Sequence, residues 1–391
     1  MNTKFWICIS LMALLCAFQN DPTAAREAKV NVVFSQLLPN GKFDEAASQL
    51  QELGMNDAYK YVKAHKNTDF DYFFFYQNFV TPSVKSSESA FFASKSAKND
   101  VISIDLEKKR AELGRLLFYD PILSANAKRT CSSCHKSQKA FTDHRIVSRG
   151  FLFSESLSKN APTLLNATTQ TRFFHEGQHK RLEDVFEAVI TNPKEFNFSY
   201  AGILERLNGS DAYKTLFFKA FPTESTIKRA ELDASLIGFL KILRGYDSPF
   251  DSLLNVKSAT PNTPEVLGFN LFMGKAKCGS CHLAPSFGGS LAPFSDGHET
   301  HEVNGKMIKT PSLRNVALTE PYMHDGRMAK IEDIFEERFH KKYKTDLTGS
   351  EREKVLIFLK SLNDKPHLEA NEPDALPLIL GFERRNVGGT Y

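Results

Sequence analysis

Apolar and polar residues along this chain recur mostly with the spacing of amphipathic helices. Residues 43–55 (FDEAASQLQELGM) and 69–80 (DFDYFFFYQNFV) predict short helices with one apolar face, and residues 350–364 (SEREKVLIFLKSLND) predict a helix near the C-terminus. The aromatic run from Phe73 to Tyr76 is expected to lie in a core. Few segments show the alternation of a half-buried strand, so the pattern predicts a mainly α protein.

Two polar stretches divide the helical segments. Residues 83–100 (SVKSSESAFFASKSAKND) are rich in Ser and Lys and predict a surface connector, and residues 255–262 (NVKSATPN) predict a linker. After the linker, Thr263 is expected to cap a helix that begins at Pro264. The predicted organisation is therefore a helical N-terminal region at 27–104, a first domain at 105–255, and a second domain with a C-terminal tail at 256–391.

The first 22 residues predict an export signal. Lys4 precedes a short apolar stretch that runs from Phe5 to Phe18, which is too short for a membrane span. We therefore expect a periplasmic protein. Lipid attachment at Cys16 is an alternative to simple cleavage, although the preceding Leu15 is larger than the residue such sites usually carry.

Charge excludes some classes of partner. The chain has 50 basic and 46 acidic residues among 391, interleaved along its length, for a formal net charge of +4. This balance argues against a nucleic-acid-binding stripe or a polybasic membrane patch.

The cysteines outside the signal segment form two Cys-x-x-Cys-His units, CSSCH at 131–135 and CGSCH at 278–282. This pattern is the attachment signature of c-type haem, in which the two thiols bond to the porphyrin and the histidine binds the iron. A zinc site would need a second ligand pair nearby in the sequence, a thioredoxin-like motif would need a βαβ context, and two disulfides would not explain the spacing. The predicted haem-binding residues are Cys131, Cys134, His135, Cys278, Cys281 and His282.

A faint repeat surrounds the two units. LGRLLFYD, beginning at Leu113, precedes the first unit, and LGFNLFMG, beginning at Leu267, precedes the second. A phenylalanine follows each haem histidine within six residues, at Phe141 and Phe287. The repeat predicts two copies of a small helical cytochrome domain. A chance match between two amphipathic helices remains open on the repeat alone.

Five blocks around and between the two units resemble the bacterial dihaem cytochrome c peroxidase family, which includes the enzyme that matures methylamine dehydrogenase. They are LGRLLFYDPILS, NAPTLLNA, LEDVFEAVITNPKEF, FNLFMGKAKCGSCH and KTPSLRNVALTEPYMHDG, in this order within residues 105–370. The resemblance implies a peroxidatic first haem and an electron-transferring second haem. It also implies H₂O₂ as substrate, a small cytochrome c or copper protein as electron donor, and a homodimer.

The resemblance also implies roles for particular residues. Its catalytic glutamate falls on Glu195 in the sequence Asn-Pro-Lys-Glu, where a carboxylate would move a proton between the peroxide oxygens. Its calcium ion, held between the domains, would bind Asn160, Thr319 and Pro321, since oxygen ligands suit Ca²⁺.

The first haem site departs from the family pattern at three positions. A distal Gln is replaced by Val185, and a Trp between the haems is replaced by His175; the single Trp of the chain, Trp6, lies in the signal segment. The loop histidine that blocks the iron in many relatives falls on Phe151 or Leu152. We therefore expect a five-coordinate first haem. Ligation by His144 is the alternative.

The sixth ligand of the second haem is less well defined. The family position falls on Arg338, which is an implausible ligand, and the nearest candidate is His340. An exposed role for His340 is the alternative. Met323 and Met328 are weaker candidates for this ligand, and Met307 is a more distant one. His324, in the PYMHDG block, is expected to have a structural or electron-relay role.

Three functions are therefore considered. The leading one is a peroxidase that reduces H₂O₂. The others are a dihaem oxidase acting on a protein or organic substrate, and a non-enzymatic electron carrier with two six-coordinate irons. The N-terminal region is expected to cap the first haem domain, with donor docking as the alternative.

Overall fold

The computed structural model describes residues 26, 29–66, 70–81, 101–244, 247–256, 262–288, 300–303, 305–337, 340, 346–365 and 370–389. Within these residues the chain is mainly helical, which confirms the predicted fold class, and the strands form one antiparallel hairpin. None of the helices in the described ranges is long and apolar enough to cross a membrane. The predicted export signal lies outside these ranges.

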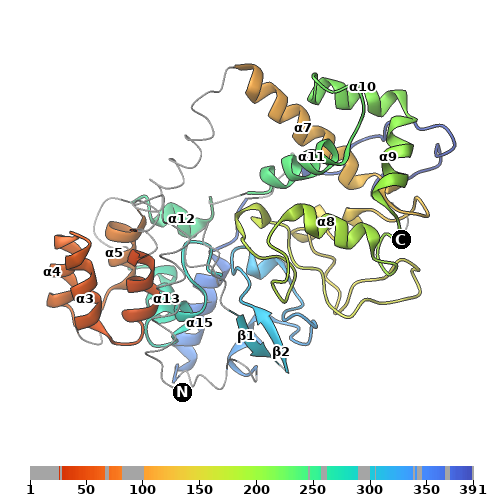
Figure 1. Ribbon diagram of the computed structural model, residues 1–391. Helices are drawn as coiled ribbons and strands as arrows, with labels where there is room; N and C mark the ends of the chain where they lie inside the picture. The colour runs from red at the N-terminus through yellow and green to blue at the C-terminus, as the bar shows by residue number, and fades with distance from the viewer. Residues whose placement is uncertain are drawn as a thin grey trace.

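The first haem domain is built around two helices that pack against each other, α7 (Val101–Tyr119) and α11 (Arg229–Ile242). Three shorter helices surround this pair in the upper right of Figure 1. They are α8 (Leu182–Thr191), α9 (Tyr200–Asn208) and α10 (Asp211–Ala220).

The second haem domain repeats this plan with α13 (Pro264–Met273) packed against α15 (Gly349–Lys360) (Figure 1). Thr263 accepts a hydrogen bond from the N–H of Val266 and Pro264 is the first helical residue, which confirms the predicted helix start. The short helix α12 (Pro249–Leu253) precedes α13. The hairpin of β1 (Thr300–Val303) and β2 (Lys306–Lys309) pairs Thr300 with Lys309.

The glycine of each Leu-Gly-x-x-Leu-Phe segment allows the closest approach of two helices. A Cβ atom at Gly114 of α7 would lie 1.9 Å from the carbonyl oxygen of Ser235 in α11. A Cβ atom at Gly268 of α13 would lie 2.0 Å from the carbonyl oxygen of Lys354 in α15. Only glycine fits at either crossing, so the faint repeat has a structural cause and the predicted duplication of a helical domain is confirmed.

Each domain also contains the same cluster of three phenylalanines. One comes from the first helix, one follows the haem histidine, and one comes from the last helix. Ring centroids lie between 4.8 and 6.4 Å apart within each cluster, and all six side chains are buried. Such packing fixes the loop after each haem histidine against the helical pair. The clusters are Phe118, Phe141 and Phe239, and Phe272, Phe287 and Phe358.

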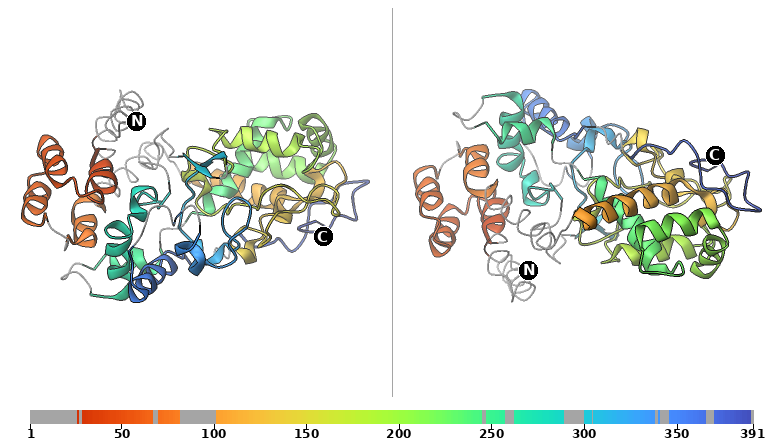
Figure 2. Two further views of the ribbon diagram at one scale, coloured as in Figure 1. Left: turned by 90° about the horizontal axis from the view of Figure 1, so that it is seen from below. Right: turned by 90° about the horizontal axis from the view of Figure 1, so that it is seen from above.

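Among the described residues, the N-terminal region packs on the core of the second haem domain and not on that of the first. Figure 2 shows it at one end of the molecule, beside α13. Phe34 stacks on Phe269 of α13 with centroids 6.3 Å apart, and Tyr76 lies 5.6 Å from the same ring. The expectation of a cap on the first domain was therefore wrong. The elements of the N-terminal region are η1 (Val33–Leu37), α3 (Phe43–Glu52), α4 (Asn56–Ala64), α5 (Tyr72–Phe75) and η2 (Tyr76–Val80).

The C-terminal tail crosses from the second domain to the first, at the opposite end of the molecule from the N-terminal helices (Figure 2). Arg385 forms a buried ion pair with Asp120 at 2.7 Å, and Asp120 also accepts a hydrogen bond from the Tyr213 hydroxyl. Gly388 accepts a hydrogen bond from the Thr130 hydroxyl, directly before the first Cys-x-x-Cys-His unit. The tail therefore belongs to the packing of the first domain.

Replacing Arg385 with Leu should destabilise the protein strongly, because it leaves the fully buried Asp120 carboxylate without its cation. Breaking a buried pair from one side costs about 3–5 kcal/mol of unfolding free energy. Chemical denaturation of the haem-loaded protein measures this loss. The control, Lys214→Ala, removes an exposed pair with Asp211 and should leave the free energy of unfolding nearly unchanged. Equal effects of the two variants would show that the tail does not support the domain.

Candidate functional site

The first Cys-x-x-Cys-His unit forms a tight helical turn, η4 (Cys131–Ser133). Thr130 caps this turn by exchanging hydrogen bonds with Ser133, and the backbone N–H of His135 donates to the carbonyl of Cys131 at 3.0 Å. The turn presents both thiols and the imidazole from one short segment. The His135 Nδ1 atom lies 3.0 Å from the carbonyl oxygen of Phe141.

The second unit repeats this geometry in η7 (Cys278–Ser280), where the N–H of His282 donates to Cys278 at 2.9 Å. Here the Nδ1 atom of His282 lies 3.0 Å from the carbonyl oxygen of Phe287 and 3.2 Å from that of Pro311. A backbone carbonyl can only accept, so Nδ1 carries the proton in both histidines and the Nε2 lone pair is left for a metal.

These residues fit covalently bound haem. None of the four cysteines forms a disulfide, and burial raises the pKa values of Cys131 and Cys278 to about 12. Burial, and after it the charge of His340, lowers the pKa of His282 to about 4, so its imidazole is neutral. Burial likewise lowers the pKa of His135. Neutral imidazoles with Nδ1–H fixed are the form that binds iron through Nε2.

Glu195 lies in the turn that follows α8, and its carboxylate is half-buried. The Asn192 side-chain amide donates to its Oε1 atom at 2.7 Å, and the Glu195 N–H donates to the Asn192 carbonyl. Burial raises the pKa of Glu195 above its ordinary value, against the opposing effects of Asn192 and Arg129. The N–H of Ala125 donates to the Phe196 carbonyl at 3.0 Å, which joins this turn to the segment just before the first unit.

Arg129 joins the Glu195 turn to the first unit. It is 4 % exposed, and its guanidinium lies 3.7 Å from Cys134 Sγ and donates to the Arg149 carbonyl at 2.5 Å. The loop that starts at Arg149 returns to the turn, because the N–H of Phe151 donates to the Lys194 carbonyl at 2.7 Å. The positions expected for a blocking histidine therefore lie beside the glutamate turn. The Leu152 side chain points outward and is 54 % exposed.

His144, the alternative ligand of the first haem, contacts the second domain. Its Nε2 atom lies 3.0 Å from the Leu318 carbonyl oxygen, and its Nδ1 atom lies 4.0 Å from the Glu320 carboxylate. Both ring nitrogens thus have partners across the domain boundary.

The predicted calcium residues meet at the same boundary. The Asn160 side-chain nitrogen donates to the carbonyls of Pro321 at 3.0 Å and Met323 at 2.9 Å, and Thr319 lies two residues before Pro321. Among the described residues, the buried Nδ1 atom of His324 has no hydrogen-bond partner. A metal-bound water would satisfy such an atom, and turning over the Asn160 amide would present its oxygen. The residues therefore fit a hydrated cation such as Ca²⁺.

His175 occupies the position expected for a tryptophan between the haems. Its ring centroid lies 6.3 Å from that of His324, and its Nε2 atom donates to the Asn160 carbonyl at 3.0 Å. Burial lowers the pKa of His175 to about 4. A neutral histidine pair thus packs between the two haem domains.

The side chain of His340, the expected sixth ligand of the second haem, is oriented by Glu337. Its Nδ1 atom lies 3.2 Å from the carboxylate of Glu337, which also pairs with Arg327 at 2.9 Å. A carboxylate on Nδ1 leaves Nε2 for a metal. Its charge also acts on the pKa of His282, so the two histidines lie close together. His301 of β1 acts on that pKa as well and was missed in the sequence.

A longer repeat was also missed. PTLLNATTQTRFFHEG, from Pro162, matches PSLRNVALTEPYMHDG, from Pro311, and both copies adopt left-handed backbone conformations at the same places. An alignment of the chain with itself would have shown that the two domains correspond well beyond the Cys-x-x-Cys-His units. The left-handed pairs are Asn166 and Asn315, Phe174 and Met323, and Gly177 and Gly326.

The chain is similar to known proteins over most of these elements. Residues 108–259 match the family model described as di-haem cytochrome c peroxidase. The cytochrome c551 peroxidase of Nitrosomonas europaea is 32% identical over 274 residues, which cover 66% of this chain and 80% of that protein. The methylamine utilization protein MauG of Methylorubrum extorquens is 28% identical, covering 67% of this chain and 80% of that protein.

A solved structure agrees with these relatives. A MauG-like protein associated with microbial copper homeostasis superposes with a TM-score of 0.57 at 28% identity, covering 66% of this chain and 90% of that one. Membership in a dihaem family implies two haem c groups, one for each Cys-x-x-Cys-His unit. The chain belongs to the di-haem cytochrome c peroxidase family.

Proposed function

We propose that this protein is a periplasmic peroxidase that reduces H₂O₂ to water. Peroxide would bind at the first haem, held by His135, and electrons would arrive through the second haem, held by His282. The observation that carries the proposal is the half-buried carboxylate of Glu195, in a turn that backbone hydrogen bonds join to the chain on both sides of the first Cys-x-x-Cys-His unit.

The overall reaction consumes two electrons and two protons for each H₂O₂ and yields two water molecules. The haems, when bound, supply the electrons and the open iron position. Glu195 would accept the proton of the oxygen nearer the iron and deliver it to the farther oxygen, which leaves as water. The Asn192 amide would fix the orientation of the Glu195 carboxylate for this transfer. Because the side chain of Val185 cannot hydrogen-bond, we assign the acid–base role to Glu195 alone.

Calcium belongs to the same proposal. Bound at Asn160, Thr319 and Pro321, it would fix the boundary between the two haem domains, where His175 and His324 pack. His340 would be the sixth ligand of the second haem, supported by Glu337.

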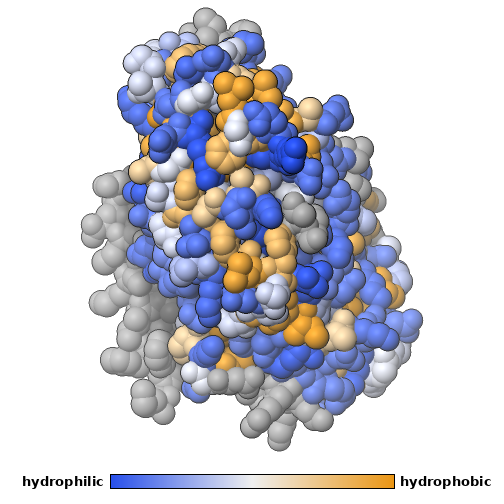
Figure 3. Space-filling view, turned by 90° about the vertical axis from the view of Figure 1, so that its right-hand side faces the viewer, coloured by the Kyte–Doolittle hydropathy of each residue, from blue (hydrophilic) through white to orange (hydrophobic). Residues whose placement is uncertain are grey.

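The electron donor would be a small cytochrome c or a copper protein. Figure 3 shows the face of the molecule that carries the first haem domain, where hydrophobic residues lie in groups between hydrophilic ones. We assign no docking surface to this face.

A dihaem oxidase acting on a protein or organic substrate is the second candidate, favoured by the likeness to MauG. His175 in place of tryptophan argues against it, since tryptophan is the more readily oxidised side chain. Peroxide consumption that depends on a reduced donor protein separates the two functions.

Replacing Glu195 with Gln should lower kcat/KM for H₂O₂ by about 100-fold or more, because general acid–base groups contribute about 10²–10⁴-fold. Steady-state turnover with a reduced small cytochrome measures the effect. Glu187→Gln, on the exposed part of α8, serves as the control and should leave turnover near the wild-type value. Unchanged turnover in Glu195→Gln would remove Glu195 from the mechanism.

The pH profile should reflect the raised pKa of Glu195. The carboxylate must be deprotonated to accept a proton, so kcat/KM should fall as pH decreases through this pKa. Because burial raises the pKa, the inflection should lie above the ordinary glutamate value of about 4.3. The inflection should vanish from the residual activity of Glu195→Gln. An inflection at the same pH in both proteins would assign it to another group.

A further inference from the structure

The two haem domains support their proximal histidines in nearly the same way. In the first, the Thr163 hydroxyl donates to the Ala140 carbonyl at 2.6 Å and accepts from the N–H of Leu165. In the second, the Ser312 hydroxyl donates to the Ser286 carbonyl at 2.5 Å and accepts from the N–H of Arg314. Both domains therefore share this hydroxyl bridge. The residue whose N–H donates to the hydroxyl differs, because it is Leu165 in the first domain and Arg314 in the second.

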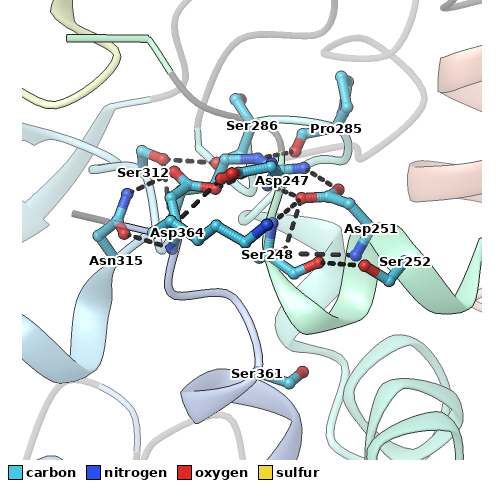
Figure 4. Close-up of polar contacts among 12 residues, drawn as sticks. Asp247, Ser248, Asp251, Ser252, Pro285, Ser286, Ser312, Asn315, Ser361 and Asp364 are labelled. Carbon is cyan, nitrogen blue, oxygen red and sulfur yellow. Dashed lines mark hydrogen bonds and ion pairs between the residues drawn. The ribbon is translucent and has the colours of Figure 1, made fainter. Parts of the chain in front are cut away.

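That difference is large in chemical terms. Leu165 is a buried apolar residue, whereas Arg314 is a buried cation only 3 % exposed. The guanidinium of Arg314 donates to both oxygens of Asp251, at 2.8 and 2.9 Å, and its Nε–H donates to the Pro285 carbonyl at 2.9 Å. Figure 4 shows the labelled residues Asp251, Pro285 and Ser312 close together with the polar contacts among them.

Asp251 is itself fixed in place. Ser248 donates to its Oδ2 atom from the hydroxyl at 2.7 Å and from the backbone N–H at 3.1 Å. Burial alone would raise the pKa of Asp251, but the hydrogen bonds from Arg314 and Ser248 hold that pKa below its ordinary value. The pair is thus ionised and its fork-to-fork geometry is rigid.

Arg314 hydrogen-bonds to the same loop that follows His282 and orients its imidazole. Pro285 lies three residues after His282, and the carbonyl of Phe287 accepts from both His282 Nδ1–H and the N–H of Leu313, the residue before Arg314. Pro311, the second acceptor for Nδ1–H, lies three residues before Arg314. One guanidinium therefore ties together the segments that carry both acceptors.

We propose that Arg314, paired with Asp251, is a positioning residue for His282 that keeps its Nδ1–H bonded to the Phe287 and Pro311 carbonyls and thereby holds down the reduction potential of the second haem. A hydrogen bond from Nδ1–H makes an imidazole a more basic ligand, which favours the ferric ion. The first haem lacks this device, because Leu165 stands in its place. The inference rests on the proposed function only in assigning electron transfer to the second haem.

The test is Arg314→Lys in the haem-loaded protein. Lysine keeps the charge opposite Asp251 but cannot make the bidentate pair and the Pro285 contact together. We expect the midpoint potential of the second haem to rise by an amount equivalent to about a tenfold change in its reduction equilibrium, about 59 mV for a one-electron couple. The first haem should keep its potential. Potentiometric titration followed by absorbance resolves the two haems and needs no peroxide turnover.

The matched control is Lys275→Ala, which removes an exposed pair with Glu351 in the same domain and should leave both potentials unchanged. A second-haem potential equal to that of the wild type in Arg314→Lys, or an equal shift of both haems, would overturn the proposal. If Arg314→Lys does not retain the second haem, Asp251→Asn is measured instead. Asparagine keeps one acceptor oxygen, so a selective rise supports the proposal and no rise contradicts it.

A loss of peroxide turnover would not by itself bear on this inference. Potentials that shift as expected in a protein without peroxidase activity would sustain the role of Arg314 and reject the proposed function.

Discussion

Each proximal imidazole donates its Nδ1–H to the backbone carbonyl of a residue in the left-handed conformation. Phe141 and Phe287, which accept from His135 and His282, have φ angles of 57° and 51°. A non-glycine residue in this region costs about 1–3 kcal/mol and persists only where its surroundings enforce it. Here the enforcing contacts are the phenylalanine clusters between the first and last helices of each domain. Each domain thus contains the same packed arrangement, in which a helical pair that crosses at a glycine supports the loop that orients the haem histidine.

The two copies are completed by different terminal segments. The C-terminal tail binds the first unit through Gly388 and Thr130, and the N-terminal helices bind the second through Gln36, whose side-chain amide donates to the Ser280 carbonyl at 2.7 Å. Both contacts reach residues inside or next to a Cys-x-x-Cys-His unit. Together with Arg314, present only in the second copy, these segments make the surroundings of the two haems unequal, which a division of labour between them requires.

Much of this arrangement could be predicted from the sequence, because the informative signals are local. The Cys-x-x-Cys-His spacing, the Leu-Gly-x-x-Leu-Phe segments, and the capping of α13 by Thr263 each depend on a few neighbouring residues. The contacts that could not be predicted join distant residues. The apolar face around Phe34 indicates that this segment packs against another element, but it does not identify Phe269 as the residue in contact. Likewise, nothing near Arg314 in the sequence identifies Asp251 as its partner, and His301 and His340 approach His282 only in the folded chain.

We propose that the two haems are unequal, with an open iron at His135 and a second iron closed by His340. Electron paramagnetic resonance of the fully oxidised, haem-loaded protein tests this most directly, since a five-coordinate ferric haem is high-spin and a bis-histidine haem is low-spin. The account predicts one high-spin and one low-spin signal of equal weight, with the low-spin signal lost or altered in His340→Ala. Two low-spin signals in the wild-type protein would contradict it, because a ligand such as His144 would then close the first iron to peroxide.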